Sequence, residues 1–155
     1  MMEEQAQIYL NQYLESLNYS KREKYQSFSA DYFCADEHNA NLCADLIRIG
    51  QKTATCSLRF WYESDDEPIP IVGHLMVVTD WNGKPVCIVE IDSVEECKYS
   101  DVSADFAYLE GEGDRSLEWW RKAHWDFFAK KFEELNIKPC EDMMLVLEKS
   151  HVVYQ

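Results

Sequence analysis

The chain has 155 residues, 46% of them hydrophobic and 14% aromatic, which is enough apolar material for one compact domain with a packed core. Its formal net charge of −14 argues against non-specific binding to a nucleic-acid backbone, because such binding depends on Lys and Arg side chains that neutralise phosphates. Any nucleic-acid function should therefore use a local pocket or a local basic patch.

The N-terminal segment and the cysteines favour a soluble, cytoplasmic protein. Residues 1–17 are acidic and amphipathic, unlike a secretory signal, and no apolar run approaches the roughly 20 residues that a membrane span needs. No cysteine belongs to a C-x-x-C pair, so a zinc site of ordinary ligand spacing is not expected. We expect buried free thiols rather than disulfides at Cys34, Cys43, Cys56, Cys87, Cys97 and Cys140.

Two helices and one extended segment are predicted in the first third of the chain. Leucines at helical spacing predict a helix over residues 3–17, and residues 25–34 favour a short strand or an irregular extended segment. A second helix is predicted from about residue 36 to residue 49, with Asp36 or Asn39 as its N-cap.

The middle and the end of the chain show the patterns of β-strands. Asn82-Gly83, between two apolar runs, is typical of a tight β-hairpin turn. Residues 92–102 are expected to continue as a polar strand and turn. The sheet should be built from residues near 53–62, 74–80, 85–95 and 143–154.

One long helix is expected to interrupt these strands, from an N-cap at Ser116 to about Leu135. The helices thus cluster in the first third of the chain and around residues 116–135, with an antiparallel hairpin between them. This order predicts an α+β fold, in which an antiparallel or mixed sheet curls into a small barrel with helices packed around it.

The segment "GQKTATCS", residues 50–57, places a lysine where a helix ends and a strand begins. Gly50 is expected to adopt the left-handed conformation that ends the helix, and Lys52 could then simply complement the helix dipole. Alternatively, Lys52 is a base that activates a hydroxyl, which requires a pKa lowered by burial or by a cationic neighbour. In a strand Thr53, Thr55 and Ser57 share one face and Lys52 the other, so contact between Lys52 and Thr55 needs a bend near Gly50.

Three carboxylates alternate with glycines just before the long helix, in the sequence "EGEGD". Glu110, Glu112 and Asp114 could simply favour the helix N-terminus through its dipole. The glycines leave a second interpretation open, because they permit close backbone approach and unusual dihedral angles that capping does not require. Crowded carboxylates are also candidates for raised pKa values.

Ser116, Trp120 and His124 lie four residues apart on one stripe of the long helix. An indole beside an imidazole and a hydroxyl could line a pocket and stack on a base. The alternative is that Trp120 belongs to the core and His124 is its hydrogen-bonded neighbour near the surface.

Taken together, the two segments resemble a known family. Residues 50–55, "GQKTAT", resemble the G-x-K-T-x-T signature of ASCH domains, which are relatives of the PUA fold. Residues 110–128, which begin "EGEGDRSL", resemble a second signature of the larger bacterial branch of that family. The resemblance covers about residues 25–154. It implies an N-terminal helical extension over residues 1–24 and an ASCH domain over residues 25–155, with RNA or a nucleoside bound in a cleft between sheet and helices.

The resemblance also implies a set of site residues. One branch of the family resembles an amidohydrolase acting on acetylcytidine, and its catalytic lysine and threonine fall on Lys52 as base and Thr55 as nucleophile. Its glutamate falls on Glu112, or on Glu110, and would handle protons at the leaving amine. The expected substrate-binding residues are Thr53, Ser57, Glu110, Asp114, Arg115, Ser116, Trp120 and His124.

No cofactor and no bound metal are expected for this reaction, and the expected partner is RNA or a modified nucleoside or nucleotide. Three alternatives stay open: a non-catalytic RNA- or nucleotide-binding module, a scaffold for protein interactions, and a ribonuclease assisted by divalent ions near Glu110, Glu112 and Asp114. If Lys52 belongs to a pocket, its amine should point inward toward Glu112 or Glu110, because a buried ammonium without such a partner is unfavourable.

Overall fold

The computed structural model describes residues 2–155, which form a five-stranded mixed sheet with helices on both faces. Along the sheet the strand order is β1-β3-β4-β5-β2. The strands are Phe28–Asp31 (β1), Ala54–Leu58 (β2), Leu75–Thr79 (β3), Pro85–Lys98 (β4) and Met144–Tyr154 (β5). The helices are Glu4–Ser16 (α1), Tyr19–Arg22 (α2), Glu37–Arg48 (α3), Arg59–Ser64 (α4), Ala104–Glu110 (α5) and Leu117–Glu134 (α6), with a 3-10 turn at Tyr99–Asp101 (η1).

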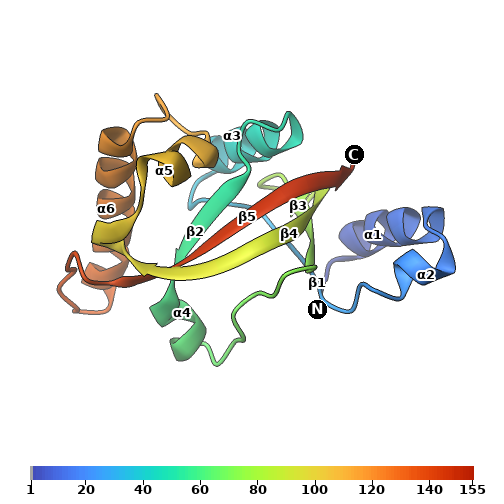
Figure 1. The fold of residues 1–155 in the computed structure, drawn as a ribbon, viewed down its shortest axis with the longest axis horizontal. Helices are drawn as coiled ribbons and strands as arrows, with labels where there is room; N and C mark the ends of the chain where they lie inside the picture. Colours follow the sequence, from blue (N-terminus) through green and yellow to red (C-terminus); the bar gives the residue numbers. More distant parts are fainter. Residues whose placement is uncertain (1) are drawn as a thin grey trace.

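The long antiparallel ribbon of β4 and β5 forms the centre of the sheet (Figure 1). β3 pairs antiparallel with β4 and β2 antiparallel with β5, whereas β1 runs parallel to β3. The α+β fold class predicted from the sequence is confirmed. Closure into a barrel is not, because β1 and β2 are the two edges of an open sheet and do not pair with each other.

The helices cover the two faces of the sheet in separate groups (Figure 1). Alternate residues of β3 point to opposite sides: Leu75 and Val77 pack against α1, while Val78 packs against α3. At the other end of the sheet, α5 and α6 cover the side of β2 and β5 that carries Leu145. Within residues 2–155, no helix is long and apolar enough to cross a membrane.

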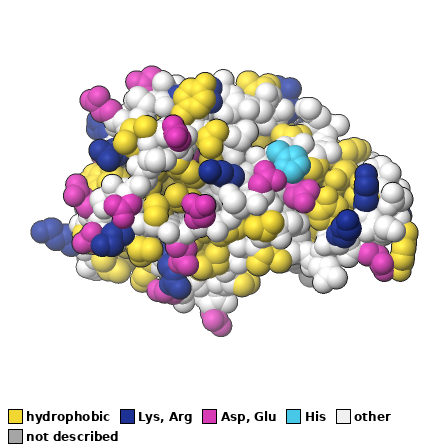
Figure 2. Space-filling view, viewed as in Figure 1, with side chains coloured by type: hydrophobic (Ala, Val, Ile, Leu, Met, Phe, Trp, Pro, Cys, Tyr) yellow, Lys and Arg dark blue, Asp and Glu magenta, His cyan; other side chains and the backbone are white. Residues whose placement is uncertain are grey.

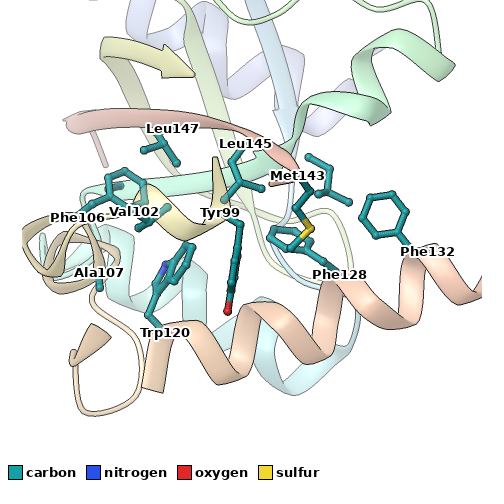
Figure 3. Packing of buried hydrophobic residues seen from close by; sticks show 12 residues of the cluster. Tyr99, Val102, Phe106, Ala107, Trp120, Phe128, Phe132, Met143, Leu145 and Leu147 are labelled. Atoms are coloured by element: carbon teal, nitrogen blue, oxygen red, sulfur yellow. The ribbon is translucent and has the colours of Figure 1, made fainter. Parts of the chain in front are cut away.

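The largest core cluster lies between α6 and this end of the sheet (Figure 3). Trp120 and Phe128 are fully buried there, Phe128 with its ring against Trp61 of α4 at a centroid distance of 6.0 Å. This packing fixes α6 against the sheet and thereby places the loop between α5 and α6, residues 111–116, beside the start of β2.

Local signals in the sequence placed several elements correctly. Ser116 Oγ accepts a hydrogen bond from the backbone N–H of Trp119 and begins α6, and Asp36 caps α3 in the same way through Asn39. Gly83, with a φ of 83°, completes the predicted turn between β3 and β4.

One expectation for secondary structure is wrong, and one helix was not expected. Residues 59–62 were expected to prolong a strand, but they form helix α4, because Phe60 and Trp61 bury their rings against the core cluster. Residues 104–110 form helix α5, which the sequence pattern did not predict. Its N-cap is Ser103, whose hydroxyl accepts from the N–H of Phe106, and Gly111 ends it with a φ of 74°.

Candidate functional site

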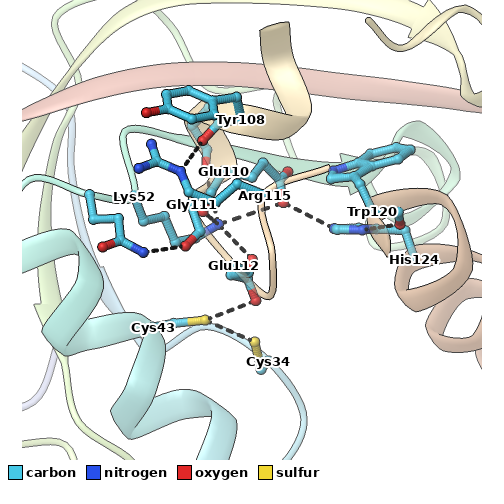
Figure 4. A network of polar contacts seen from close by, with 12 residues as sticks. Cys34, Cys43, Lys52, Tyr108, Glu110, Gly111, Glu112, Arg115, Trp120 and His124 are labelled. Atoms are coloured by element: carbon cyan, nitrogen blue, oxygen red, sulfur yellow. Dashed lines mark hydrogen bonds and ion pairs between the residues drawn. The ribbon is translucent and has the colours of Figure 1, made fainter. Parts of the chain in front are cut away.

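The side chain of Lys52 points into the protein, at the junction between α3 and β2 (Figure 4). Its backbone N–H donates to the carbonyl of Leu46, because Gly50 turns the chain back at the end of α3 with a φ of 80°. Only 3% of the side chain is exposed. The interpretation in which Lys52 is a solvent-exposed charge at the end of a helix is therefore wrong.

Three acceptors surround the ammonium group of Lys52, which matches its three protons. Nζ lies 2.9 Å from the Ala54 carbonyl oxygen, 3.0 Å from Glu112 Oε2 and 3.4 Å from the Glu110 carbonyl oxygen. It also lies 3.7 Å from Glu110 Oε2. The inward position of Lys52 beside a glutamate, as predicted, is confirmed.

Glu110 forms a second ion pair on the far side of the lysine. Its Oε2 lies 3.0 Å from Nε2 of His124, and only 2% of the Glu110 side chain is exposed. The other ring nitrogen of His124, Nδ1, lies 2.8 Å from the carbonyl oxygen of Trp120. Both neighbours of the ring are acceptors, so both ring nitrogens carry protons and His124 is an imidazolium.

The pKa values follow from the balance between burial and these charges. Burial alone would lower the pKa of Lys52, but the charges of Glu110 and Glu112 outweigh it and raise the pKa above its ordinary value. Burial alone would raise the pKa of Glu110, but Lys52 and His124 lower it to about 2. His124 behaves like Lys52: burial opposes its charge, and the hydrogen bond with Glu110 raises its pKa.

Lys52 is therefore a positive charge in this state, and the base role implied by the resemblance stays a prediction, because it would need ligand binding to loosen these ion pairs. A lysine base requires a lowered pKa, and the two glutamates impose the opposite. The four charged groups form a network with no net formal charge, in which each cation lies between carboxylate and carbonyl oxygens (Figure 4).

The glycines of the "EGEGD" segment let its backbone approach two other segments closely. A Cβ atom at Gly111 would lie 2.5 Å from the carbonyl oxygen of Gln51, and one at Gly113 would overlap the indole ring of Trp119. The side chain of Gln51 also donates to the carbonyl of Gly111 over 2.8 Å. This close packing places Glu110 and Glu112 on either side of the Lys52 ammonium group.

Thr55, the expected nucleophile, is not part of this network. Along β2 the side chains alternate, so Cys56 faces the core cluster and Thr55 faces the other side of the sheet. There Thr55 lies opposite Glu148 of β5, and Ser57 is hydrogen-bonded to Tyr62 over 2.8 Å. Within residues 2–155, no hydrogen bond joins the Thr55 hydroxyl to Lys52 or to either glutamate of the network.

Thr53 contributes through its backbone. Its N–H donates to the Leu109 carbonyl over 2.8 Å, and its own carbonyl accepts from the N–H of Ser150 over 2.9 Å. Thr53 and Lys52 also line a small hollow of about 190 Å³ beside the end of α3, below the usual volume of a ligand pocket, roughly 300–1,000 Å³. The larger hollow, about 590 Å³, runs along α6 and contains none of the predicted site residues.

The expectation that Trp120 stacks on a bound base is wrong. Its ring is 1% exposed and lies between two neighbours, with Tyr99 at 5.7 Å and His124 at 4.2 Å between centroids, both in stacked geometry. Trp120 thus belongs to the core, and His124 is its neighbour on the side of the ion-pair network.

The remaining predicted residues shape the loop before α6. Asp114 accepts a hydrogen bond from the N–H of Ser116 over 2.8 Å and is exposed, so it does not converge with the two glutamates on one ion. Arg115 lies over the ring of Tyr108, with its guanidinium carbon 3.6 Å from the ring centroid, and Nε donates to the Tyr108 carbonyl.

Three cysteines that were not assigned to the site lie against it. Cys43 of α3 donates from Sγ to Glu112 Oε1 over 3.4 Å, and the Sγ atoms of Cys34 and Cys43 are 3.3 Å apart. Cys56 lies close to the Glu110 carboxylate. Helical periodicity could have placed Cys43 on the buried face of α3, but nothing in the sequence indicated which carboxylate it would meet.

Two groups of three side chains have the ligand atoms that a metal ion could use, all within 4.8 Å of one another: Cys34, Cys43 and Glu112, and Cys56, Glu110 and His124. In each group the carboxylate is already bound to a protonated cation, Lys52 or His124. A divalent ion would have to displace that cation. Neither group is the predicted set of Glu110, Glu112 and Asp114.

The sequence profile of the ASCH domain matches residues 29–154. The chain belongs to the ASCH domain family. It is 59% identical to an ASCH domain from Lactobacillus crispatus JV V101, whose crystal structure matches with a TM-score of 0.96 over 99% of this chain and 97% of that chain. A search of curated protein sequences finds no match.

A second solved structure extends the comparison to a more distant sequence. A protein from Enterococcus faecalis V583 is 25% identical and matches with a TM-score of 0.82 over 97% of this chain and 88% of that chain. The fold of this ASCH domain, including helix α1 at its N-terminus, therefore recurs in proteins of low sequence identity. The division into a helical extension and a domain stays a prediction, although α1 packs on β3 through Leu10.

Proposed function

We propose that this ASCH domain binds a nucleoside, or a single unpaired base of an RNA chain, at the Glu112 carboxylate. The observation that carries the proposal is the position of Glu112 at the outer edge of the ion-pair network. Its side chain is 18% exposed, whereas those of Lys52 and Glu110 are 3% and 2% exposed. A carboxylate fixed by a buried ammonium group is a preorganised acceptor for the N–H groups on the edge of a base.

Neighbouring side chains complete a site of this kind. The ring of Phe33 lies 6.0 Å from Lys52 Nζ and offers an apolar wall near the carboxylate. Arg115 follows Glu112 by three residues and is held over Tyr108, where its guanidinium can meet a phosphate or a ribose hydroxyl. These contacts support recognition of one nucleoside unit.

The charge of the molecule favours a small ligand over a duplex. In the face shown in Figure 2, Lys and Arg side chains are scattered among Asp and Glu side chains without a continuous basic patch. With a net charge of −14, binding of a long polyanion would have to overcome repulsion, whereas a nucleoside brings no charge.

Calorimetric titration tests this proposal. The panel is cytidine, acetylated cytidine, uridine, adenosine, guanosine and a short single-stranded RNA, with each titration repeated at two salt concentrations. We expect at least one nucleoside to bind, with an affinity that Glu112→Gln lowers about tenfold, because a hydrogen bond to a charged group contributes roughly 1.5–3 kcal/mol.

Glu118→Gln is the matched control, since Glu118 is an exposed acid on the first turn of α6. Absence of binding across the panel would rule out nucleoside recognition. Equal affinities of wild type and Glu112→Gln would remove the site from Glu112. Binding that weakens steeply with salt would indicate contacts to the RNA backbone instead.

Hydrolysis of an amide on a modified nucleoside is a second candidate, favoured by the same contact between Glu112 and Lys52. In this arrangement Glu112 would accept a proton from a water that attacks the amide carbon, and the Lys52 ammonium group would stabilise the negative charge that develops on the amide oxygen. Glu112 would then give the proton to the amine nitrogen as the C–N bond breaks, which releases the amine and the acid. Incubation with acetylated cytidine, followed by chromatography, is the test. No cytidine produced, or equal production by Glu112→Gln, would reject the hydrolytic mechanism and leave binding.

A further inference from the structure

We propose that Cys34 and Cys43 are a peroxide-sensitive thiol pair, which closes to a disulfide directly beside the nucleoside site. The modification itself does not depend on what the site binds. Its consequence for binding rests on the function proposed above.

The two thiols are already in contact. Their Sγ atoms are 3.3 Å apart, and a disulfide bond of about 2.05 Å needs a further approach of about 1.3 Å. Cys34 lies in the segment between β1 and α3, outside any helix or strand, so its backbone can move toward Cys43 without breaking a ladder of hydrogen bonds. Cys43 is held within α3 and is 1% exposed.

The two cysteines have different environments, which assigns them different roles. Cys34 is exposed, and its contact with the Cys43 thiol lowers its pKa despite partial burial. For Cys43, that same contact, burial and the charge of Glu112 all raise the pKa. Cys34 is therefore the thiol that reacts first, and Cys43 is the thiol that resolves the product.

The oxidant that this chemistry requires is a peroxide. The Cys34 thiolate attacks one oxygen of hydrogen peroxide, the O–O bond breaks, and the departing hydroxide takes up a proton to become water, leaving a sulfenic acid on Cys34. The sulfur of Cys43 then attacks the sulfur of Cys34 and loses its proton. The S–S bond forms as the sulfenic oxygen leaves as a second water, so two thiols have lost the two electrons that the peroxide gained.

Disulfide formation would change the surroundings of Glu112. In the reduced state the Cys43 thiol donates a hydrogen bond to Glu112 Oε1, while Lys52 donates to Oε2. A disulfide has no proton to donate, so Oε1 would lose its donor and Glu112 could turn away from α3. Oxidation should therefore change the affinity for a nucleoside.

A disulfide fits this cluster better than a metal ion. Two thiolates on one tetrahedral zinc, at about 2.3 Å from the ion, would be separated by roughly 3.8 Å, which is wider than the observed contact. The nearby Lys52 ammonium group, 3.0 Å from Glu112 Oε2, also opposes a divalent cation. A chelator included in the test keeps the two chemistries apart.

Mass spectrometry of peroxide-treated protein tests the thiol pair. The sequence contains no Lys or Arg between Tyr25 and Arg48, so trypsin releases both cysteines in one peptide, residues 25–48. After treatment with a small molar excess of hydrogen peroxide and a chelator, this peptide should be about 2 Da lighter and resist alkylation, since two hydrogens are lost. The free thiols should fall from six to four, and dithiothreitol should restore them.

Matched variants locate the reaction. Cys34→Ser should abolish the lighter peptide and leave Cys43 as an unoxidised thiol. Cys140→Ser should react like wild type, because Cys140 is exposed but forms no thiol–thiol contact in the described residues. Retention of six free thiols in treated wild type, or a gain of oxygen at Cys34 without loss of the two hydrogens, would overturn the proposal.

The effect on binding is measured separately, by titrating reduced and oxidised wild type with the nucleoside that binds best. A change of about tenfold or more, absent from Cys34→Ser treated in the same way, would support coupling between the thiols and the site. Disulfide formation with no nucleoside bound in either state would reject the proposed function and keep the thiol pair. Nucleoside binding without a disulfide would do the reverse.

Discussion

Replacement of Lys52 by methionine is the sharpest test of the ion-pair network. Methionine is close in length to lysine and apolar, so Lys52→Met removes the charge with little change in volume. It leaves Glu112 without its cation and Glu110 with His124 alone, in a region where Lys52 is 3% exposed. Removing one partner of a buried ion pair destabilises a protein by about 3–5 kcal/mol.

Chemical denaturation followed by tryptophan fluorescence measures this loss in the free energy of unfolding. Thermal denaturation is the second measurement: for a chain of this length each 1 kcal/mol lowers the melting temperature by roughly 2–4 °C, so we expect the melting temperature to fall by roughly 6–20 °C. The double variant Lys52→Met/Glu112→Gln should recover part of the loss, because it also removes the unpaired carboxylate. Lys122→Met is the control, since Lys122 pairs with Asp126 at the surface and should contribute little.

A loss below about 1 kcal/mol in Lys52→Met would refute the reasoning, because it would mean that the ammonium group exchanges its partners for water. A double variant no more stable than the single one would also contradict it. In that case Glu112 would not be the group that the lysine stabilises.

Three further predictions concern other parts of the fold. Burial raises the pKa of Glu148 to about 7 from 4.5, so its stabilising contribution is present below pH 4.5 and is lost as the pH rises through 7. Between acidic and alkaline pH the wild type should lose up to roughly 3 kcal/mol of its free energy of unfolding through this group. Denaturation of Glu148→Gln at the same two pH values should lack that part of the loss. Gly111→Ala should destabilise the protein by more than Gly73→Ala, although both glycines have positive φ, because only at Gly111 does a Cβ meet backbone, 2.5 Å from the Gln51 carbonyl oxygen; equal losses would argue against the close approach. Phe128→Ala, at a site 1% exposed, should cost about 3–5 kcal/mol, and a loss near zero would mean that α6 packs differently.

The parts of the fold that the sequence predicted correctly depend on local chemistry. Ser116 and Asp36 cap their helices through hydrogen bonds three residues along the chain, and Gly83 supplies a turn dihedral that other residues disfavour. Each signal is complete within one short segment. No partner elsewhere in the chain is needed to interpret it.

The parts that the sequence did not predict depend on distant partners. Aromatic residues such as Phe60 and Trp61 favour strands. Here their rings pack against α6, and this contact stabilises helix α4 instead. The parallel pairing of β1 with β3 joins Phe28 to Leu75, which no local pattern encodes. The open edges of the sheet, which contradict the expected barrel, are likewise a property of the whole arrangement.

The candidate site divides in the same way. Alternation along β2 already placed Thr55 and Lys52 on opposite faces, and the bend at Gly50 does not bring the threonine to the lysine. The pairing of Lys52 with Glu112 followed from the requirement that a buried ammonium group have an anionic partner. The pairing of Glu110 with His124 was not predicted, because it depends on where α6 packs relative to the end of α5.

The energetics of the network support the proposal that Glu112 is the group that binds a ligand. A buried ion pair is often no more stabilising than apolar side chains of the same volume, so stability alone does not account for four charged groups in a protein interior. Glu110 and Lys52 are almost completely enclosed, so neither presents a solvent-facing position, although Glu110 Oε1 has no hydrogen-bond partner among the described residues. Glu112 has the greatest exposure of the four, at 18%, and its orientation is fixed by Lys52 on one oxygen and Cys43 on the other. The enclosed charges therefore act as the support that holds one accessible carboxylate in place, which is the arrangement that a preorganised binding group requires.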